Sequence, residues 1–255
     1  MTLGVYCILV VLASLLGGAL PSRLRLTHTR LQVTVSFVAG LMLGVALLHM
    51  IPHAAEHLSL DATVRWAVGG LLLMFFLIRA FHFHEHEAGM GHGEGEEAPL
   101  SRGHPHPWIG VAVGLSIHSA VDGVALASST LAEHGPLPGL GTFLAVLLHK
   151  PLDALAIAAL MVGRPAPTRR LVNLAFAFVC PLGAALFVMG AGSDAVSSAA
   201  LAFAAGAFLC ISLGDLLPEL QFHRHDRLKL SAALLLGVAI AYAVTFLEHG
   251  RHGVE

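Results

Sequence analysis

WIGVAVGLSIHSAVDGVALASSTL at residues 108–131 and GLGTFLAVLLHKPLDALAIAALMV at residues 139–162 are the stretches that decide the fold. Each is an apolar run long enough to cross a bilayer, and each carries one His and one Asp four residues apart. The pairs are His118 with Asp122 and His149 with Asp153. On a helix this spacing puts the imidazole and the carboxylate on one face, one turn apart. Because ionisable groups inside apolar segments are costly, the pairs indicate a function.

The composition is typical of a polytopic membrane protein. Hydrophobic residues make up 56% of the 255 residues and charged residues 12%, whereas soluble domains carry about 25% charged residues. The formal net charge is −2, and the basic residues form short clusters without interleaved aromatic residues. We therefore exclude nucleic acid as a partner.

Eight apolar runs predict eight transmembrane helices, because each run is near the about twenty residues that span a bilayer. The runs lie at 3–20, 31–51, 62–81, 108–131, 139–162, 170–191, 195–217 and 229–248. The first run has no Lys or Arg before it and several Arg after it, the reverse of a signal peptide, so we expect it to span. The expected fold is an all-α bundle forming a single transmembrane domain, 1–255.

The basic residues predict the orientation of this bundle. Eleven of them follow spans one, three, five and seven: Arg23, Arg25, Arg30, Arg79, Arg102, Arg164, Arg169, Arg170, Arg224, Arg227 and Lys229. The loops of the opposite side hold only Arg65 and Arg251. By the positive-inside rule, both termini lie outside and the loop at 82–107 is cytoplasmic. The expected location is the plasma (inner) membrane.

The two His/Asp pairs are predicted to meet near the middle of the membrane. Both histidines lie about ten residues from the start of their spans, roughly 15 Å into a core about 30 Å thick. The short turn at 133–138 makes the spans antiparallel, which puts His118 opposite Asp153 and Asp122 opposite His149. Two imidazoles and two carboxylates suit Zn²⁺, Fe²⁺ or Mn²⁺. The alternative is that these polar groups only pack helices together in lipid.

Other residues in apolar segments bear on this site. Pro151 lies between His149 and Asp153, where it is predicted to kink the helix and free the Leu147 carbonyl. Cys7, Cys180 and Cys210 lie in apolar runs and predict neither a disulfide framework nor a CxxC site.

Three further clusters are candidates for handling ions. His49, His53 and His57 recur every four residues at the predicted outer end of span two, as a candidate entrance. Asp215 and Glu219 flank Pro218 at the predicted inner end of span seven, as a candidate exit. Polar residues that are simply tolerated at helix ends are the alternative for both clusters.

The predicted cytoplasmic loop at 82–107 is rich in His, Glu and Gly. Its candidates for metal capture are His82, His84, His86 and His92. Such a composition is typical of a flexible, metal-attracting tract. A solvated linker is the alternative.

These features together resemble the ZIP (Zrt/Irt-like) family of divalent-metal transporters, of the prokaryotic type. The shared features are eight spans with both termini outside, a His-rich cytoplasmic loop after the third span, and His-x-x-x-acid motifs in spans four and five. The resemblance extends to His49-Met-Ile-Pro, Cys180-Pro-Leu-Gly and Asp215-Leu-Leu-Pro-Glu219. It implies uptake of zinc above all, or of iron, manganese or cadmium, into the cytoplasm by alternating access. It also implies that the transport site is formed by His118, Asp122, His149 and Asp153.

The chain departs from relatives whose transport site binds two metals. Where those relatives carry further ligands, this chain has Ser119, Lys150 and Cys180. The Lys150 ammonium replaces a carboxylate and would repel a second divalent ion, so we expect a mononuclear site. Cys180 is either a weak soft ligand or a small packing residue.

Two other functions remain open from the residues alone. An intramembrane zinc-dependent hydrolase acting on lipid would need an open metal position and a separate general base. A metal sensor would bind ions without flux. For a transporter we expect no enzymatic activity and no cofactor, and protonation of the site residues could couple flux to pH. Small residues such as Gly69, Gly70, Ala204, Ala205 and Gly206 would allow close helix packing within the chain or in a homodimer.

Overall fold

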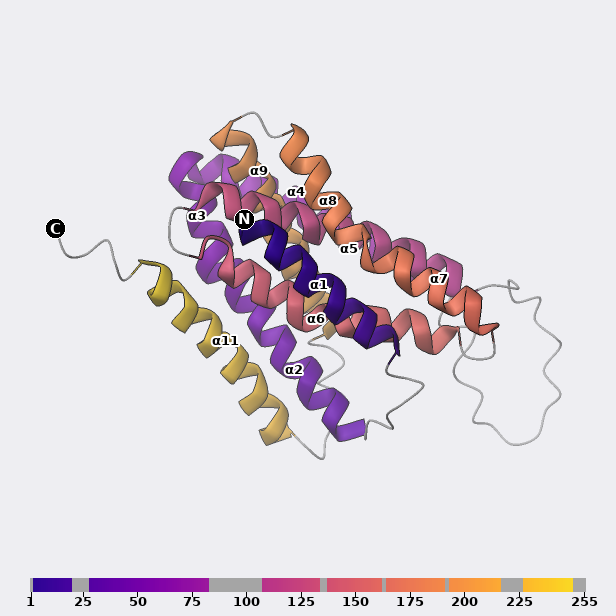
Figure 1. Cartoon of the computed structure of the whole chain (residues 1–255). Helices are drawn as coiled ribbons and strands as arrows, with labels where there is room; N and C mark the ends of the chain where they lie inside the picture. Colours follow the sequence, from indigo (N-terminus) through magenta and orange to yellow (C-terminus); the bar gives the residue numbers. More distant parts are fainter. Residues whose placement is uncertain are drawn as a thin grey trace.

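The computed structural model describes residues 2–19, 28–82, 107–133, 137–161, 164–190, 193–216 and 227–249 (Figure 1). Within them, eight helical segments are long and apolar enough to cross a membrane, which confirms the predicted all-α fold. The helices are α1 (Thr2–Ala19), α2 (His28–Val45), η2 (Ala46–Met50), α3 (Ile51–His57), α4 (Leu60–His82), α5 (Pro107–Ala132), α6 (Leu140–Leu160), α7 (Ala166–Ala177), α8 (Val179–Gly190), α9 (Asp194–Ile211), η3 (Ser212–Leu216) and α11 (Arg227–His249).

The second span is longer than its apolar run predicts. Helix α2 continues through the π-helical turn η2 into α3 and ends at His57, six residues beyond the expected end at residue 51. Pro52 lies at the start of α3, directly after the wider turn. A wider turn accommodates a proline ring and its missing N–H, so the proline does not end the helix.

Two prolines in the middle of later spans, Pro151 and Pro181, have different effects. The sixth span is divided at Phe178 into α7 and α8, three residues before Pro181. Because Pro181 has no N–H to donate to the carbonyl of Ala177, one helical hydrogen bond is lost there, and the break places Pro181 in the first turn of α8, where a proline is tolerated. In contrast, α6 runs as a single helix through Pro151.

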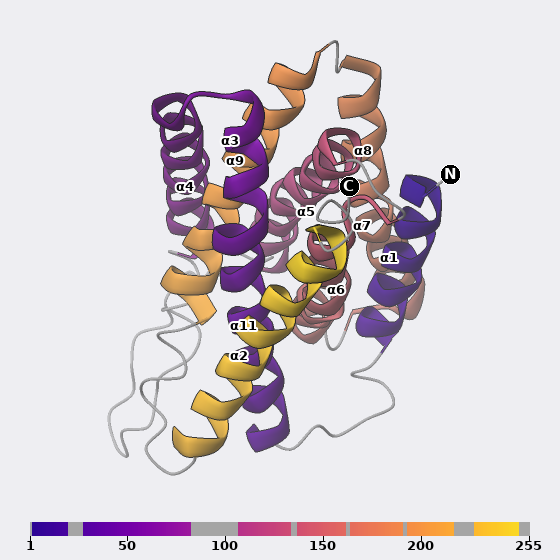
Figure 2. The ribbon, with the colours of Figure 1, turned by 90° about the vertical axis from the view of Figure 1, so that its left-hand side faces the viewer.

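The helices associate in close neighbouring pairs. Helix α2 lies beside α11, α4 beside α9, α5 beside α8, and α1 beside α6 (Figures 1 and 2). Glycines set the closest approach: a Cβ on Gly70 would overlap the carbonyl oxygen of Phe203, and one on Gly206 would overlap that of Ala67. These two small residues therefore pack α4 against α9 within the chain.

The same reciprocal arrangement fixes α5, which carries half of the predicted site. A Cβ on Gly123 would overlap the carbonyl oxygen of Cys180, and a Cβ on Gly183 would overlap that of Ala120. Backbone lies directly against backbone between α5 and α8. Helix α5 can lie this close to α8 only because both positions are glycine.

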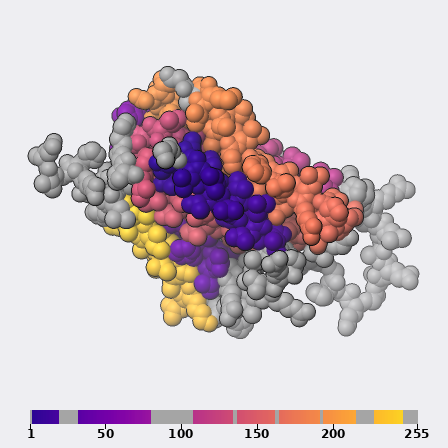
Figure 3. Space-filling view, in the orientation of Figure 1, coloured from indigo at the N-terminus to yellow at the C-terminus, as the bar shows by residue number. Residues whose placement is uncertain are grey.

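Apolar side chains cover the outside of the bundle as well as its core. Helix α1 lies along the outside of the molecule (Figure 3) and exposes Val5, Ile8, Leu9, Leu12 and Leu16. Exposed apolar surface over a whole helix marks a face that contacts something other than water. In a chain with eight such spans, this face contacts the lipid bilayer.

Candidate metal centre

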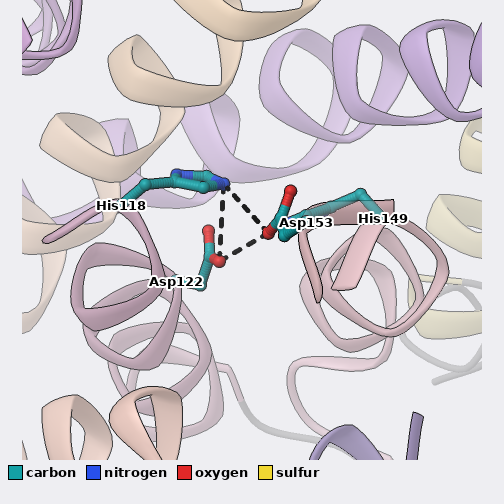
Figure 4. Close-up of side chains that lie close together, drawn as sticks. All are labelled: His118, Asp122, His149 and Asp153. Carbon is teal, nitrogen blue, oxygen red and sulfur yellow. Dashed lines mark hydrogen bonds and ion pairs between the residues drawn. The ribbon is translucent and has the colours of Figure 1, made fainter. Parts of the chain in front are cut away.

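Helices α5 and α6 bring together the four side chains that the sequence singled out. His118 and Asp122 project from α5, and His149 and Asp153 project from α6 toward them (Figure 4). The Asp122 side chain is completely buried, and both histidines are buried. Asp153 is the most accessible of the four, with 14% of its side chain exposed. The site therefore lies inside the bundle, and Asp153 is its least buried side chain.

The four ligand atoms form a crossed set between the two helices. His118 Nε2 lies 3.6 Å from Asp122 Oδ2 on its own helix and 3.7 Å from Asp153 Oδ2 across the interface. His149 Nε2 lies 3.2 Å from Asp122 Oδ2 across the interface and 3.8 Å from Asp153 Oδ2 on its own helix. All four atoms lie within 4.8 Å of one another.

These separations match the size of a small metal ion. Zn²⁺ binds His nitrogen and carboxylate oxygen at about 2.0–2.2 Å in a tetrahedron, which puts neighbouring ligand atoms about 3.3–3.6 Å apart. The observed nitrogen to oxygen separations of 3.2, 3.6, 3.7 and 3.8 Å are close to that value. Little movement of the side chains is needed to surround one ion.

Hydrogen bonds orient part of this set for metal binding. The Nδ1 atom of His149 lies 2.8 Å from the carbonyl oxygen of Ala145, which can only accept, so Nδ1 is the donor. The Nε2 atom of His149 faces Asp122 Oδ2 at 3.2 Å, where it donates a hydrogen bond. When an ion replaces that proton, the Nε2 lone pair is directed at the ion. Among the described residues, His118 Nδ1 and Asp122 Oδ1 are buried without a hydrogen-bond partner. A buried polar atom without a protein partner calls for a bound water or ion, and Asp122 Oδ1 is placed to bind either.

Lys150 extends into the same site. Its side chain is 0% exposed, and its Nζ lies 2.9 Å from Asp122 Oδ2 and 3.6 Å from Asp153 Oδ2. The ammonium also lies 5.1 Å from the centre of the Phe176 ring. Lys150 therefore does not extend to the edge of the membrane but pairs with both carboxylates of the centre.

Ser119, Pro151 and Cys180, which the sequence predicts to influence the centre, lie around it in different ways. Ser119 is buried on α5, beside His118. Pro151 contacts α1, where a Cβ on Gly17 would overlap its backbone. Cys180 is fully buried on α8 against Gly123, and its thiol is not part of the group of ligand atoms within 4.8 Å.

The predicted entrance cluster differs from the sequence expectation. His49 is not at a helix end but is buried in η2, where its Nε2 lies 2.8 Å from Glu133 Oε1. His53 lies beside it, whereas His57 is exposed at the end of α3 and outside the group. Glu133 is not among the residues predicted from the sequence. It is the acidic residue directly after the fourth apolar run, at the predicted outer end of span four. This position, at the same predicted end of the bundle as His49 and His53, could have pointed to their contact.

The candidate exit residues and the candidate metal-capturing histidines of the loop fall outside the part of the chain that the structure describes. Glu219 and the loop histidines His84, His86 and His92 lie outside the described residues, as do the side chains of His82 and Asp215. Their roles stay predictions.

A cavity of about 320 Å³ lies between α1, α6 and α7, and none of the four side chains of the centre lines it. Its walls include Ala154, the residue after Asp153, and Phe176, whose ring faces the Lys150 ammonium. It continues to Arg169 and Arg170 at the start of α7. In the opposite direction, Leu126 and Val146 are fully buried one turn beyond the centre. The cavity therefore begins one residue beyond Asp153 along α6, whereas apolar side chains are packed on the opposite side of the centre.

Comparison with known proteins identifies a family. The profile of the family described as ZIP zinc transporter matches residues 82–245, which is more than half of the chain and includes all four side chains of the centre. No curated protein matches the chain.

Proposed function

The chain belongs to the ZIP zinc transporter family, a family of divalent-metal transporters, and we propose that His118, Asp122, His149 and Asp153 are its transport site. The observation that carries the proposal is the crossed set of two imidazoles and two carboxylates with separations of 3.2–3.8 Å. Such a set binds a divalent ion while its two negative charges offset the loss of the ion's hydration shell.

We propose further that the site carries one ion at a time. Two carboxylates and the Lys150 ammonium have a summed charge of −1, and one divalent ion changes this to +1. A second divalent ion would raise it to +3 in a buried site, where charge repulsion is poorly screened. The 2.9 Å contact between Lys150 Nζ and Asp122 Oδ2 supports this view, since the ammonium already occupies one side of that carboxylate.

We infer that the cavity lined by Ala154, the residue after Asp153, is part of an inward path used in alternating access. It extends toward Arg169 and Arg170, which the positive-inside rule assigns to the cytoplasm. We infer that this conformation releases the ion inward, and that Leu126 and Val146 separate when the site opens to the outside. Zinc is the first expectation for the cargo, because His and Asp ligands in a tetrahedron suit Zn²⁺ well.

The competing functions have less support. A lipid hydrolase needs a general base separate from the metal ligands and a substrate path to the metal. The carboxylates of the centre all serve as candidate ligands, and Asp122 is completely buried away from the lipid face. A metal sensor differs from a transporter only in lacking flux, which the experiment below measures.

Uptake into proteoliposomes tests the proposal. The native protein should accumulate Zn²⁺ along its gradient, and Asp122→Ala or Asp153→Ala should reduce uptake to the level of empty liposomes, because each removes a charged ligand. Asp61→Ala, which alters an exposed carboxylate on α4, is the matched control and should keep native uptake. Unchanged flux in both site variants would overturn the site assignment, and binding without any native flux would favour a sensor. Parallel uptake of Fe²⁺, Mn²⁺ and Cd²⁺ measures the preference.

A further inference from the structure

A second group of ligand atoms lies where η2 and α3 meet the turn between α5 and α6. It consists of His49, His53 and Glu133, whose ligand atoms lie within 4.8 Å of one another. The site proposed for transport does not use these residues. They come from segments more than seventy-five residues apart in the sequence, so only the tertiary structure brings them together.

The core of this group is a buried pair of a histidine and a carboxylate. His49 Nε2 lies 2.8 Å from Glu133 Oε1, and the two side chains are 1% and 5% exposed. The ring of His53 lies edge-on to the ring of His49, with 4.8 Å between their centres. A charged carboxylate is rarely buried unless it is paired or coordinates an ion. Two imidazoles and one carboxylate form a common set of protein ligands for zinc.

The surrounding backbone orients the carboxylate. Glu133 Oε2 accepts a hydrogen bond of 2.6 Å from the N–H of Gly139, which leaves Oε1 directed at His49. Gly139 has a φ of 75°, a left-handed conformation that favours glycine, so the turn that presents this N–H depends on that residue. Outer contacts of this kind hold metal ligands in position in known metal sites.

Helix α6 leaves room for the His49 ring. A Cβ on Gly141 would lie 3.1 Å from His49 Cδ2, so a larger residue there would press on the imidazole. The π-helical turn η2 contains His49 itself, and such turns are frequent at functional sites. On the other side of the group, His53 Nδ1 lies 3.3 Å from Glu56 Oε1.

We propose that His49, His53 and Glu133 form a second binding site for a divalent metal ion. Three protein ligands leave one coordination position for water, as in sites that exchange what they bind rather than in closed structural sites. Glu133 lies eleven residues beyond Asp122 on α5, which is about 16 Å along the helix axis. The group lies at the end of the bundle that the positive-inside rule assigns to the outside. It is therefore a staging site for an ion on its way to the central site, and this role rests on the proposed function.

Metal counting in the full-length protein tests the site directly. The native protein and each variant are reconstituted in lipid nanodiscs, and bound Zn²⁺ is measured by equilibrium dialysis. Glu133→Gln and His49→Gln should each lose one equivalent of Zn²⁺, because the amide is a poor ligand although it can keep the hydrogen bonds to the neighbours. His57→Gln is the matched control, because His57 is exposed at the end of α3, the helix that continues from η2. This variant should bind as many equivalents of Zn²⁺ as the native protein does. Metal bound elsewhere in the chain cancels in these differences.

A thermal melt separates a binding role from a structural one. Without metal, Glu133→Gln and His49→Gln should melt close to the native protein, while the rise in Tm on adding Zn²⁺ should be smaller than in the native protein. A variant that fails to fold is replaced by His53→Gln, whose side chain is 11% exposed. If the variants that fold all bind as many equivalents as native and His57→Gln, the site does not exist and the His49 to Glu133 contact is structural.

Transport kinetics distinguish this site from the central one. Glu133→Gln should raise the KM for Zn²⁺ uptake by about tenfold or more and leave kcat within about twofold, whereas Asp122→Ala abolishes uptake. Asp122→Asn combined with Asp153→Asn should still bind the equivalent that Glu133→Gln loses. Loss of that equivalent in the double variant would show that only one connected site exists. Unchanged uptake in both Asp122→Ala and Asp153→Ala would refute the central site and leave the outer one standing.

Discussion

At the scale of single residues, Lys150 determines the charge of the centre. Its ammonium lies within 3.6 Å of a carboxylate on each helix and is completely buried. A buried carboxylate without a partner is strongly destabilising, so Lys150 keeps Asp122 and Asp153 paired when no metal is bound. At the proposed site an arriving ion would have to compete with this internal cation, and we expect this competition to weaken binding.

Replacing Lys150 by Met tests this competition. We expect Zn²⁺ to bind at the central site at least about tenfold more tightly, because a unit charge within about 6 Å of a divalent ion costs several kcal/mol even at an effective dielectric constant of about 20. Lys229→Met, on the exposed start of α11, is the control and should leave the Kd unchanged. Calorimetric titration in detergent measures both. An equal or weaker affinity in Lys150→Met would show that the ammonium does not oppose the metal.

Removing the charge should also change the number of ions bound. If Lys150 excludes a second ion, Lys150→Met should admit one further equivalent of Cd²⁺ next to Asp122, seen by anomalous scattering in crystals. The native protein should show one peak at this centre. Two peaks in the native protein would contradict the single-ion site.

At the scale of helices, the fold depends on contacts between backbones. Helices in lipid gain little from burying apolar side chains against one another, so close packing through small residues becomes the main source of association. Gly70 with Gly206 joins α4 to α9, and Gly123 with Gly183 joins α5 to α8. The second contact holds the helix of His118 and Asp122, so we expect it to matter for transport at the proposed site.

Adjacent glycines on α4 provide a matched test of this packing. Gly70→Ala should destabilise the protein by roughly 1–3 kcal/mol, because its Cβ would overlap the Phe203 carbonyl oxygen. Gly69→Ala should be neutral or slightly stabilising, since the nearest atom to its Cβ is Phe203 Cδ2 at 3.9 Å and alanine favours helix. Thermal melts in one detergent compare the two. Equal melting temperatures of Gly70→Ala and Gly69→Ala would show that the close approach of α4 and α9 at Gly70 is not needed for stability.

At the scale of the whole molecule, the distribution of basic residues predicts which end faces the cytoplasm. This orientation assigns the cavity beside Asp153 to the inside and the His49, His53 and Glu133 group to the outside. Both assignments change together if the orientation is reversed. The direction of transport therefore depends on the topology.

Thiol labelling tests the topology. With Cys7, Cys180 and Cys210 replaced by Ala, a single Cys at Glu94 should react with a membrane-impermeant maleimide only after cells are opened. A single Cys at Leu60, at the start of α4, should react in intact cells. The opposite pattern would place the cavity outside and reverse the proposed direction.

The His-rich loop is predicted to adjust transport without carrying it. Deletion of residues 84–97 should shift the apparent affinity for Zn²⁺ and leave the maximal uptake rate near native, because the central ligands are all on α5 and α6. Uptake by a correctly inserted deletion variant measures both quantities. Complete loss of uptake would show that the loop takes part in the transport step itself.

Hydropathy and residue spacing along the chain were sufficient to predict the eight spans and the two His/Asp pairs. An apolar run of about twenty residues is helical in a bilayer whatever its neighbours are, and residues four apart on a helix share a face. The short turn before Gly139 also made α5 and α6 antiparallel, so the contact of His118 with Asp153 could be anticipated. Helix ends were less predictable, as α3 beyond Pro52 and the break at Phe178 show, because a π-turn or a split can absorb a proline.

Only the tertiary structure decided what lies next to these elements. It joined Glu133 to His49 and excluded His57, and it brought the Lys150 ammonium to both carboxylates. It also paired α4 with α9 and α5 with α8 through glycines that look alike in the sequence. The physical reason is that hydropathy and helical spacing depend on near neighbours in the chain, whereas helix pairing depends on which backbones can approach. The sequence by itself thus determined the helices and the chemistry of the ligands, and the packing decided their partners.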